Sequence, residues 1–163
     1  MHREQMKVRQ MNGTGLYIYM EETTVKSSSE VRNVYIRIRS VVEGVENLWE
    51  TTGEYKWDGR QHMLAYTDYT GNAITKNGIF ADHEKMLLHR VGAITCDMLF
   101  DPLTATMVDY KAYMVGAKFL LHTETYSMEE NEVGLNIRVQ YTLDDGGGHT
   151  PIVGEQEITV EYY

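Results

Sequence analysis

Apolar and polar residues alternate with a period of two along most of the chain, the pattern of strands with one buried face. The clearest case is residues 132–150, EVGLNIRVQYTLDDGGGHT, which ends in a glycine-rich turn signal. One predicted face holds the polar residues Asn136, Arg138, Gln140 and Thr142. The opposite face is apolar and is formed by Val133, Leu135, Ile137, Val139, Tyr141 and Leu143. This face covers either a packed core or a cavity.

The same alternation predicts about ten short strands after residue 30. The other strands are expected at VRNVYIRIRSVV, LWETTGEYKW, HMLAYTDY, AITKNGIF, KMLLHRV, ITCDMLF, TMVDYKAYMV, KFLLHTETYSM and PIVGEQEITVEYY. Turn signals recur roughly every 8–12 residues, which is typical of an all-β sandwich or barrel. The acidic stretch SMEENE is interpreted as a turn. Tight connections favour antiparallel neighbours in up-and-down order, and closure into a single barrel removes two exposed sheet edges.

Residues 1–30 differ from the rest because they show no sustained period of either kind. We predict an irregular, partly disordered N-terminal extension, with a short strand or turn at LYIYM. The remaining residues, 31–163, are predicted to form the barrel domain. The total of 163 residues suits one domain with its own core.

The amino-acid composition limits the kinds of partner and the cellular compartment that are expected for the protein. The chain has 24 acidic and 15 basic residues and a net charge of -9, which argues against nucleic acid or an anionic membrane as partner. The single cysteine, Cys96, cannot form an internal disulfide, which fits a reducing compartment. There is no apolar run of about 18 residues and no signal-peptide pattern. The expected location is therefore the cytoplasm.

Motifs for catalysis or cofactor binding are weak. The run DDGGGH at 144–149 precedes a strand rather than a helix, so it is interpreted as a hairpin turn and not as a phosphate loop. The six histidines include no tight ligand pair, and neither a metal nor another cofactor is predicted. Cys96 shares a face with apolar neighbours and is expected in the core. The protein is more probable as a binder than as an enzyme, and no catalytic residue is assigned.

Arg90 is the most informative charged residue because it shares a predicted strand face with Met86 and Leu88. If that face is internal, the charge needs a partner. Arg90 could bind a ligand carboxylate or phosphate, or it could form a structural ion pair. Aromatic residues and methionine on strands could line a pocket with it or could simply form core. The candidate ligand-binding residues are Arg90, Trp57, Tyr66, Met98, Phe100, Tyr110 and Tyr141.

The order of several segments resembles the YwiB-like family of bacterial domains of unknown function. These segments are TTGEYKW, LAYTDYTGNAITKNGIF, HRVGAITCDMLFD and YMVGAKFLLHTETYSMEENEVGLNIRVQYTL. The most specific features are Arg90 with Gly92, Met98 with Phe100, and Thr123 through Tyr141; YMVG lacks the proline that the family has at this turn. The resemblance covers about residues 31–163. It implies a calycin-like, lipocalin-related β-barrel in a bacterial cytoplasm and implies no established activity.

Two functional hypotheses follow. The first is a non-enzymatic binder of a small apolar or amphipathic molecule in the barrel. The alternative is a structural or protein-interaction module with a filled barrel, for which a homodimer is one form. They differ in whether the apolar faces enclose space, which the sequence does not determine.

Overall fold

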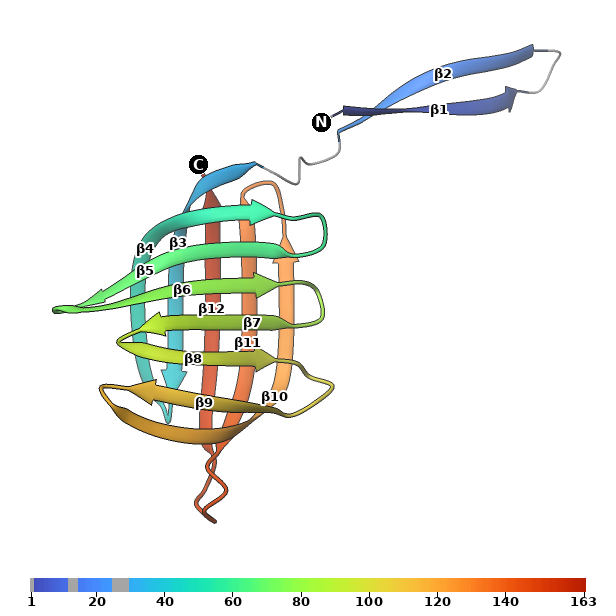
Figure 1. Ribbon diagram of the computed structural model, residues 1–163. Coiled ribbons are helices and arrows are strands. Elements are labelled where there is room, and N and C mark those ends of the chain that lie inside the picture. Colours follow the sequence, from blue (N-terminus) through green and yellow to red (C-terminus); the bar gives the residue numbers. More distant parts are fainter. Residues whose placement is uncertain (1, 12–14, 25–29) are drawn as a thin grey trace.

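The computed structural model describes residues 2–11, 15–24 and 30–163, and these form twelve strands and no helix (Figure 1). Strands β1 (His2–Met11) and β2 (Gly15–Thr24) pair with each other in a separate two-stranded sheet. The other ten strands form a closed barrel. Their bounds are β3 Val31–Val42, β4 Val45–Trp57, β5 His62–Thr70, β6 Ala73–Ala81, β7 Met86–Gly92, β8 Ile94–Phe100, β9 Thr106–Ala112, β10 Val115–Glu130, β11 Gly134–Asp144 and β12 Ile152–Tyr162.

The barrel strands follow one another in sequence order, and every pair is antiparallel. The circle is completed by β12 against β3, with Ile158 opposite Ile38. This closure joins the last strand to the first strand of the barrel and removes the exposed edges that an open meander would leave. The predicted all-β, antiparallel, up-and-down barrel is confirmed.

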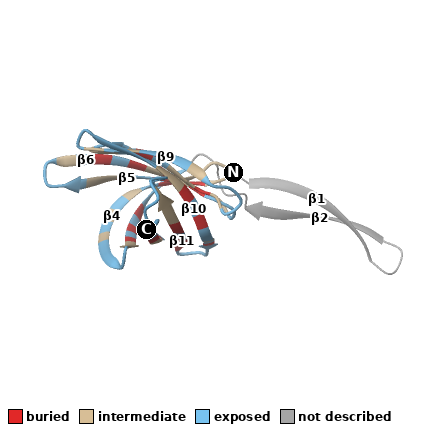
Figure 2. Ribbon diagram, turned by 90° about the horizontal axis from the view of Figure 1, so that it is seen from below, coloured by how far each residue is buried: buried red, intermediate tan, exposed pale blue. Residues whose placement is uncertain are grey.

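The core is formed by buried residues that recur along the barrel strands, drawn as red bands in Figure 2. On β3 every second residue from Val34 to Ile38 is buried, and on β11 every second residue from Leu135 to Tyr141, while the residues between them are exposed or half-buried. This is the period-two pattern of a strand that has its apolar face on a core. Val133, predicted on the same face, lies in the preceding turn and is 68% exposed.

The two ends of the barrel differ. The turns that follow β3, β5, β7, β9 and β11 lie at one end of the barrel. We call it the cavity end because a cavity lies there. At the opposite end, the terminal end, the interior holds aromatic side chains: the Tyr55 ring lies 5.1 Å from that of Tyr162, and the Trp57 ring lies 4.6 Å from the His62 imidazole. The Tyr55 hydroxyl and His62 Nδ1 are 2.9 Å apart. The terminal end is therefore closed by packed rings.

Two predicted element boundaries are corrected. The segment SMEENE was expected as a turn, yet its first four residues, 127–130, continue β10 and pair with β11; the turn begins at Asn131. The segment TMVDYKAYMV was expected as one strand, yet β9 ends at Ala112, and residues 113 and 114 form the turn. A bulge between Thr123 and Thr125 also shifts the register of β10.

The N-terminal part of the chain is described only in part. The strand predicted at LYIYM falls within β2. The predicted disorder falls partly on residues 25–29, which lie outside the described residues. The boundary at residue 30 stays a prediction, although all of the barrel pairing lies between Val31 and Tyr162.

Candidate functional site

A cavity of about 470 Å³ occupies the cavity end of the barrel. Its volume lies within the range of small-molecule sites, roughly 300–1,000 Å³. Nine of the ten barrel strands supply the lining, and β6 stands behind it. The lining residues are Ser40, Val42, Trp49, Tyr66, Asp68, Leu88, Arg90, Met98, Val108, Tyr110, Ala112, Val115, Gly116, Ala117, Phe119, Tyr141, Leu143, Ile152 and Gln156.

The lining is divided by chemistry into two arcs. Six hydrogen-bonding or charged side chains of the lining come from β12, β3, β4, β5 and β7. We call these six residues the polar arc: Gln156, Ser40, Trp49, Tyr66, Asp68 and Arg90. The lining from β8 to β11 is apolar, apart from the hydroxyls of Tyr110 and Tyr141. Because neighbouring strands in the barrel circle supply each arc, the cavity has one polar wall facing one apolar wall.

Arg90 lies on the inward face of β7, since Met86 and Leu88 on the same face are buried. Its guanidinium Nε donates a hydrogen bond to Asn77 Oδ1 at 2.9 Å, and Nη2 lies 3.6 Å from Asp68 Oδ2. The side chains of Arg90 and Asp68 are 20% and 28% exposed. Of the alternatives that the sequence left open, Arg90 therefore faces the interior and has a structural partner of opposite charge in the same wall.

Tyr66 lies beside this pair on β5 and is 9% exposed. Burial raises the pKa of its phenol to about 12, with a further increase from the Asp68 carboxylate and an opposing effect from Arg90. A buried group is harder to ionise because its charged form loses hydration. The hydroxyl is therefore a neutral donor and acceptor throughout the physiological pH range.

Strands β4 and β5 separate beside the cavity. They pair only from Glu54 with Ala65 to Trp57 with His62, so β4 residues before Glu54 and β5 residues after Ala65 face a gap. Gly53 stands at the fork: a Cβ there would lie 2.5 Å from the Ala65 carbonyl oxygen, so only glycine fits unless the strands shift.

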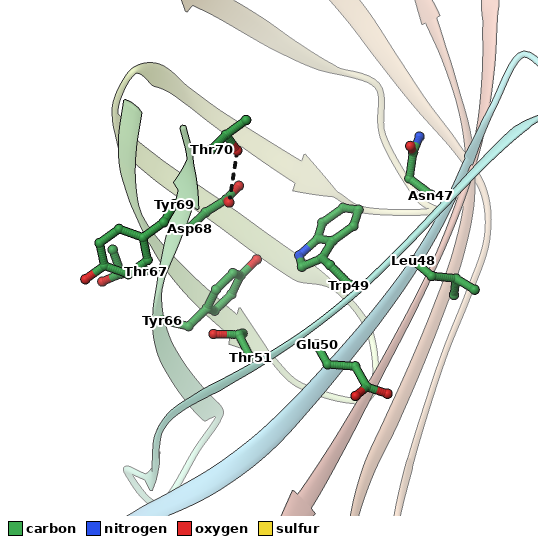
Figure 3. A pocket seen from close by; sticks show the side chains of 10 residues that line it. All are labelled: Asn47, Leu48, Trp49, Glu50, Thr51, Tyr66, Thr67, Asp68, Tyr69 and Thr70. Carbon is green, nitrogen blue, oxygen red and sulfur yellow. Dashed lines mark hydrogen bonds between the residues drawn. The ribbon is translucent and has the colours of Figure 1, made fainter. Parts of the chain in front are cut away.

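The gap forms a second hollow, of about 450 Å³, on the barrel wall. Figure 3 shows Trp49 on β4 and Tyr66 on β5 facing each other across it, with Asp68 beside them. These three side chains line both the hollow and the cavity, so they form the partition between the two. The Trp49 indole N–H is buried and finds no acceptor among the described residues.

Five of the seven candidate residues lie together in the cavity lining: Arg90, Tyr66, Met98, Tyr110 and Tyr141. The other two lie elsewhere. Trp57 belongs to the aromatic cluster at the terminal end, and Phe100 is fully buried with its ring 5.1 Å from that of Tyr141. Both side chains face inward as expected, but they lie at other heights along the barrel axis. The alternation of residues along a strand predicts which face a side chain is on and not its height in the barrel.

Several lining residues were not singled out as candidates, including Ser40, Trp49, Phe119 and Gln156. Trp49 could have been included, because it shares a strand face with Tyr55 and Trp57. Ser40 and Gln156 carry no sequence signal of their own. They become neighbours because β12 pairs with β3, which sets Gln156 opposite Ser40.

Other reactive side chains lie outside the cavity. Cys96 is 5% exposed, and burial raises the pKa of its thiol, so it resembles a core residue rather than a nucleophile. His62 Nε2 lies 3.6 Å from Glu130 Oε2 at the terminal end. Over residues 2–11, 15–24 and 30–163, no three His, Cys, Asp or Glu side chains gather as a metal site. The same part of the chain contains no helix able to cross a membrane.

Comparison with known proteins identifies the fold. A family model described as "Domain of unknown function (DUF1934)" matches residues 36–159. The crystal structure of the ywiB protein from Bacillus subtilis matches with a TM-score of 0.70 at 19% sequence identity, over 82% of this chain and 93% of that chain. At this identity the likeness establishes a shared fold alone, and it confirms the resemblance found in the sequence. No curated protein matches the chain.

Proposed function

The chain belongs to the DUF1934 family of domains of unknown function, and we propose that it binds a small amphipathic molecule in the barrel cavity without transforming it. The observation that carries this proposal is the division of the lining into a polar and an apolar arc. A ligand with an apolar body would bury that body against β8–β11 and turn its polar part toward β3, β4 and β5. Burial of apolar surface would supply most of the affinity.

The compartment belongs to the same proposal. The one cysteine is buried and unpaired, which fits a reducing environment. We therefore place the protein in the cytoplasm, where it would hold or carry a molecule of poor solubility. Fractionation of cells that produce the protein, followed by immunoblotting, would test this placement.

The first experiment compares the native and denatured masses of the purified protein by mass spectrometry. A mass lost on denaturation would identify a ligand that was carried through purification. In parallel, the neutral, polarity-sensitive dye Nile red is titrated into the protein, and its fluorescence reports access to the apolar arc.

A matched pair of variants assigns the binding to the cavity. Met98→Trp adds volume to the lining, whereas Met107→Trp makes the same change at an outward position that is 67% exposed. Filling the space should weaken Nile red binding by roughly 5- to 150-fold, because overpacking a site costs on the order of 1–3 kcal/mol. The outward variant should bind like the parent. Equal binding by both variants would show that the dye binds elsewhere.

The alternative, a protein-interaction module, is supported by a different feature. Tyr113, Met114 and Val115 are all at least 71% exposed at the tip between β9 and β10. Exposed apolar residues in a cluster are a common mark of an interface. Light scattering over a range of concentrations tests self-association: a dimer that Met114→Lys converts to a monomer, with no dye binding in either form, would favour the alternative.

A further inference from the structure

We propose that the polar group of the ligand is uncharged, such as a hydroxyl, amide or ester, and that it lies against the polar arc. This inference rests on the proposed function and specifies the ligand class for the same cavity. Two observations carry it: the charge balance of the lining and its unused neutral hydrogen-bonding groups. The buried indole N–H of Trp49 adds that the group contains an oxygen acceptor.

Among the described residues that line the cavity, one side chain is positive, Arg90, and one is negative, Asp68, with Nη2 and Oδ2 3.6 Å apart. Their charges cancel within the wall. A carboxylate bound there would leave one excess negative charge and a phosphate monoester up to about two, beside side chains that are only 20% and 28% exposed, and an ammonium group would leave one excess positive charge. Uncompensated buried charge is strongly unfavourable. The balanced pair therefore selects against both ions and explains why an internal arginine need not indicate an anionic ligand.

The lining also offers neutral hydrogen-bonding groups. The side chains of Ser40, Tyr66 and Gln156 make no hydrogen bond with any described residue. Ser40 and Gln156 are opposite each other across the β3–β12 pair. Hydroxyl and amide groups both donate and accept, whereas a carboxylate can only accept. An alcohol or amide can thus satisfy both kinds of group along this wall.

Trp49 adds a donor at the partition between the cavity and the β4–β5 gap. Its indole N–H is covered and has no acceptor among the described residues. A buried donor without a partner raises the free energy of the folded state. A ligand oxygen placed at this N–H would supply the missing acceptor, so binding of an oxygen-bearing group is favoured at this point.

The test uses four probes that share one eight-carbon chain: octanol, octanamide, octanoate and octylamine. Each displaces Nile red from the full-length protein at pH 8, where the acid is an anion and the amine a cation. Octanol and octanamide should bind at least about tenfold more tightly than either ion, the ratio expected when a charge must lose its hydration. Tighter binding of octanoate than of octanol would overturn the inference while leaving the proposed function intact.

Asp68→Asn then reverses the preference. The substitution keeps the shape of the side chain but leaves Arg90 without its counter-charge, so octanoate affinity should rise about tenfold while octanol affinity changes less than about twofold. Asp109→Asn, at an exposed position on β9, is the control for the change in net charge and should alter neither affinity. Equal octanoate affinity in the parent and in Asp68→Asn, both folded by circular dichroism, would overturn the inference.

Trp49→Phe tests the donor separately. It retains an aromatic ring and removes the N–H, so octanol and octanamide should bind roughly 2- to 10-fold more weakly while Nile red affinity is retained, as expected for the loss of one hydrogen bond. Unchanged octanol affinity would remove Trp49 from the site. If neither Nile red nor any octyl compound bound the parent protein, the proposed function would be wrong and this inference with it.

Discussion

At the scale of single residues, the cavity depends on polar groups that stay neutral or balanced. Arg90 is held by Asn77 and Asp68, and Tyr66 remains protonated because burial raises its pKa to about 12. The same cause raises the pKa values of Tyr55, Tyr126 and Tyr141. The interior thus contains several hydroxyls but only one ion pair on the cavity wall.

The buried tyrosines predict a loss of stability in alkali. A phenol whose folded-state pKa exceeds its ordinary value of 10.0 stabilises the fold fully below pH 10, and this contribution is lost as the pH rises from 10 through about 12. The free energy of unfolding, measured in urea, should therefore fall steeply over that range. Tyr66→Phe should make the fall less steep, and Tyr69→Phe, at a position 72% exposed, should not. Identical slopes in the three proteins would contradict the assignment.

Residue faces could be read from the sequence, but residue partners could not. Parity placed Arg90 on the same face as Met86 and Leu88 but left open whether that face is internal, which the structure shows it to be. Parity with Met98 and Phe100 placed Cys96 in the core. The partner Asp68 was not foreseen, because it lies on β5, two strands away from β7 in the barrel circle. A pairing of this kind depends on strand order and register, which single-residue patterns do not contain.

At the scale of elements, the turn between β9 and β10 departs from ordinary turn chemistry. Ala112 pairs with Val115, so only Tyr113 and Met114 connect the strands, with φ angles of 49° and 66°. Tight hairpin turns of this kind favour Asn-Gly, since most side chains disfavour positive φ. This is why the residue types here contain no local turn signal and why the predicted strand ran through residues 113 and 114, although the family resemblance already placed a turn at YMVG.

Replacing the two turn residues should stabilise the barrel. The double variant Tyr113→Asn/Met114→Gly supplies residues that adopt positive φ easily. We expect the free energy of unfolding to rise by about 1–2 kcal/mol. Part of this gain is offset because glycine increases the conformational entropy of the unfolded chain. Chemical denaturation followed by circular dichroism measures it. Tyr113→Phe/Met114→Leu, which keeps the conformational cost, should match the parent. A loss of stability in the Asn-Gly variant would show that Tyr113 and Met114 make contacts worth more than the strain.

At the scale of the whole molecule, the barrel is complete within residues 31–162. Closure of the barrel was predicted because a long open meander would leave exposed sheet edges, and the structure confirms this prediction. The cavity was not predictable, because the space inside depends on the number of strands and on how they tilt. Ten strands leave the cavity end open while the terminal end is filled by rings such as Tyr55 and Tyr162.

Removal of residues 1–29 should leave the barrel intact, because every barrel strand pairs with residues after Glu30. We expect the melting temperature of the shortened protein to lie within about 2 °C of the parent, as for loss of a segment that contributes no barrel pairing. Differential scanning calorimetry measures it, and Nile red affinity serves as the second readout. A large fall in the melting temperature would place the N-terminal segment among the elements that stabilise the barrel.

The pairing of β12 with β3 also governs when the protein can fold during its synthesis. Val34, on the first strand of the barrel, must wait for its register partner Tyr162, on the last strand of the barrel. Until that residue has left the ribosome, β3 presents an unpaired edge, and the ring of strands cannot close. Pairings between such distant parts of a chain slow folding and prolong the exposure of apolar surface. The nascent protein therefore exposes the unpaired edge of β3 to aggregation until β12 has been synthesised and has paired with it.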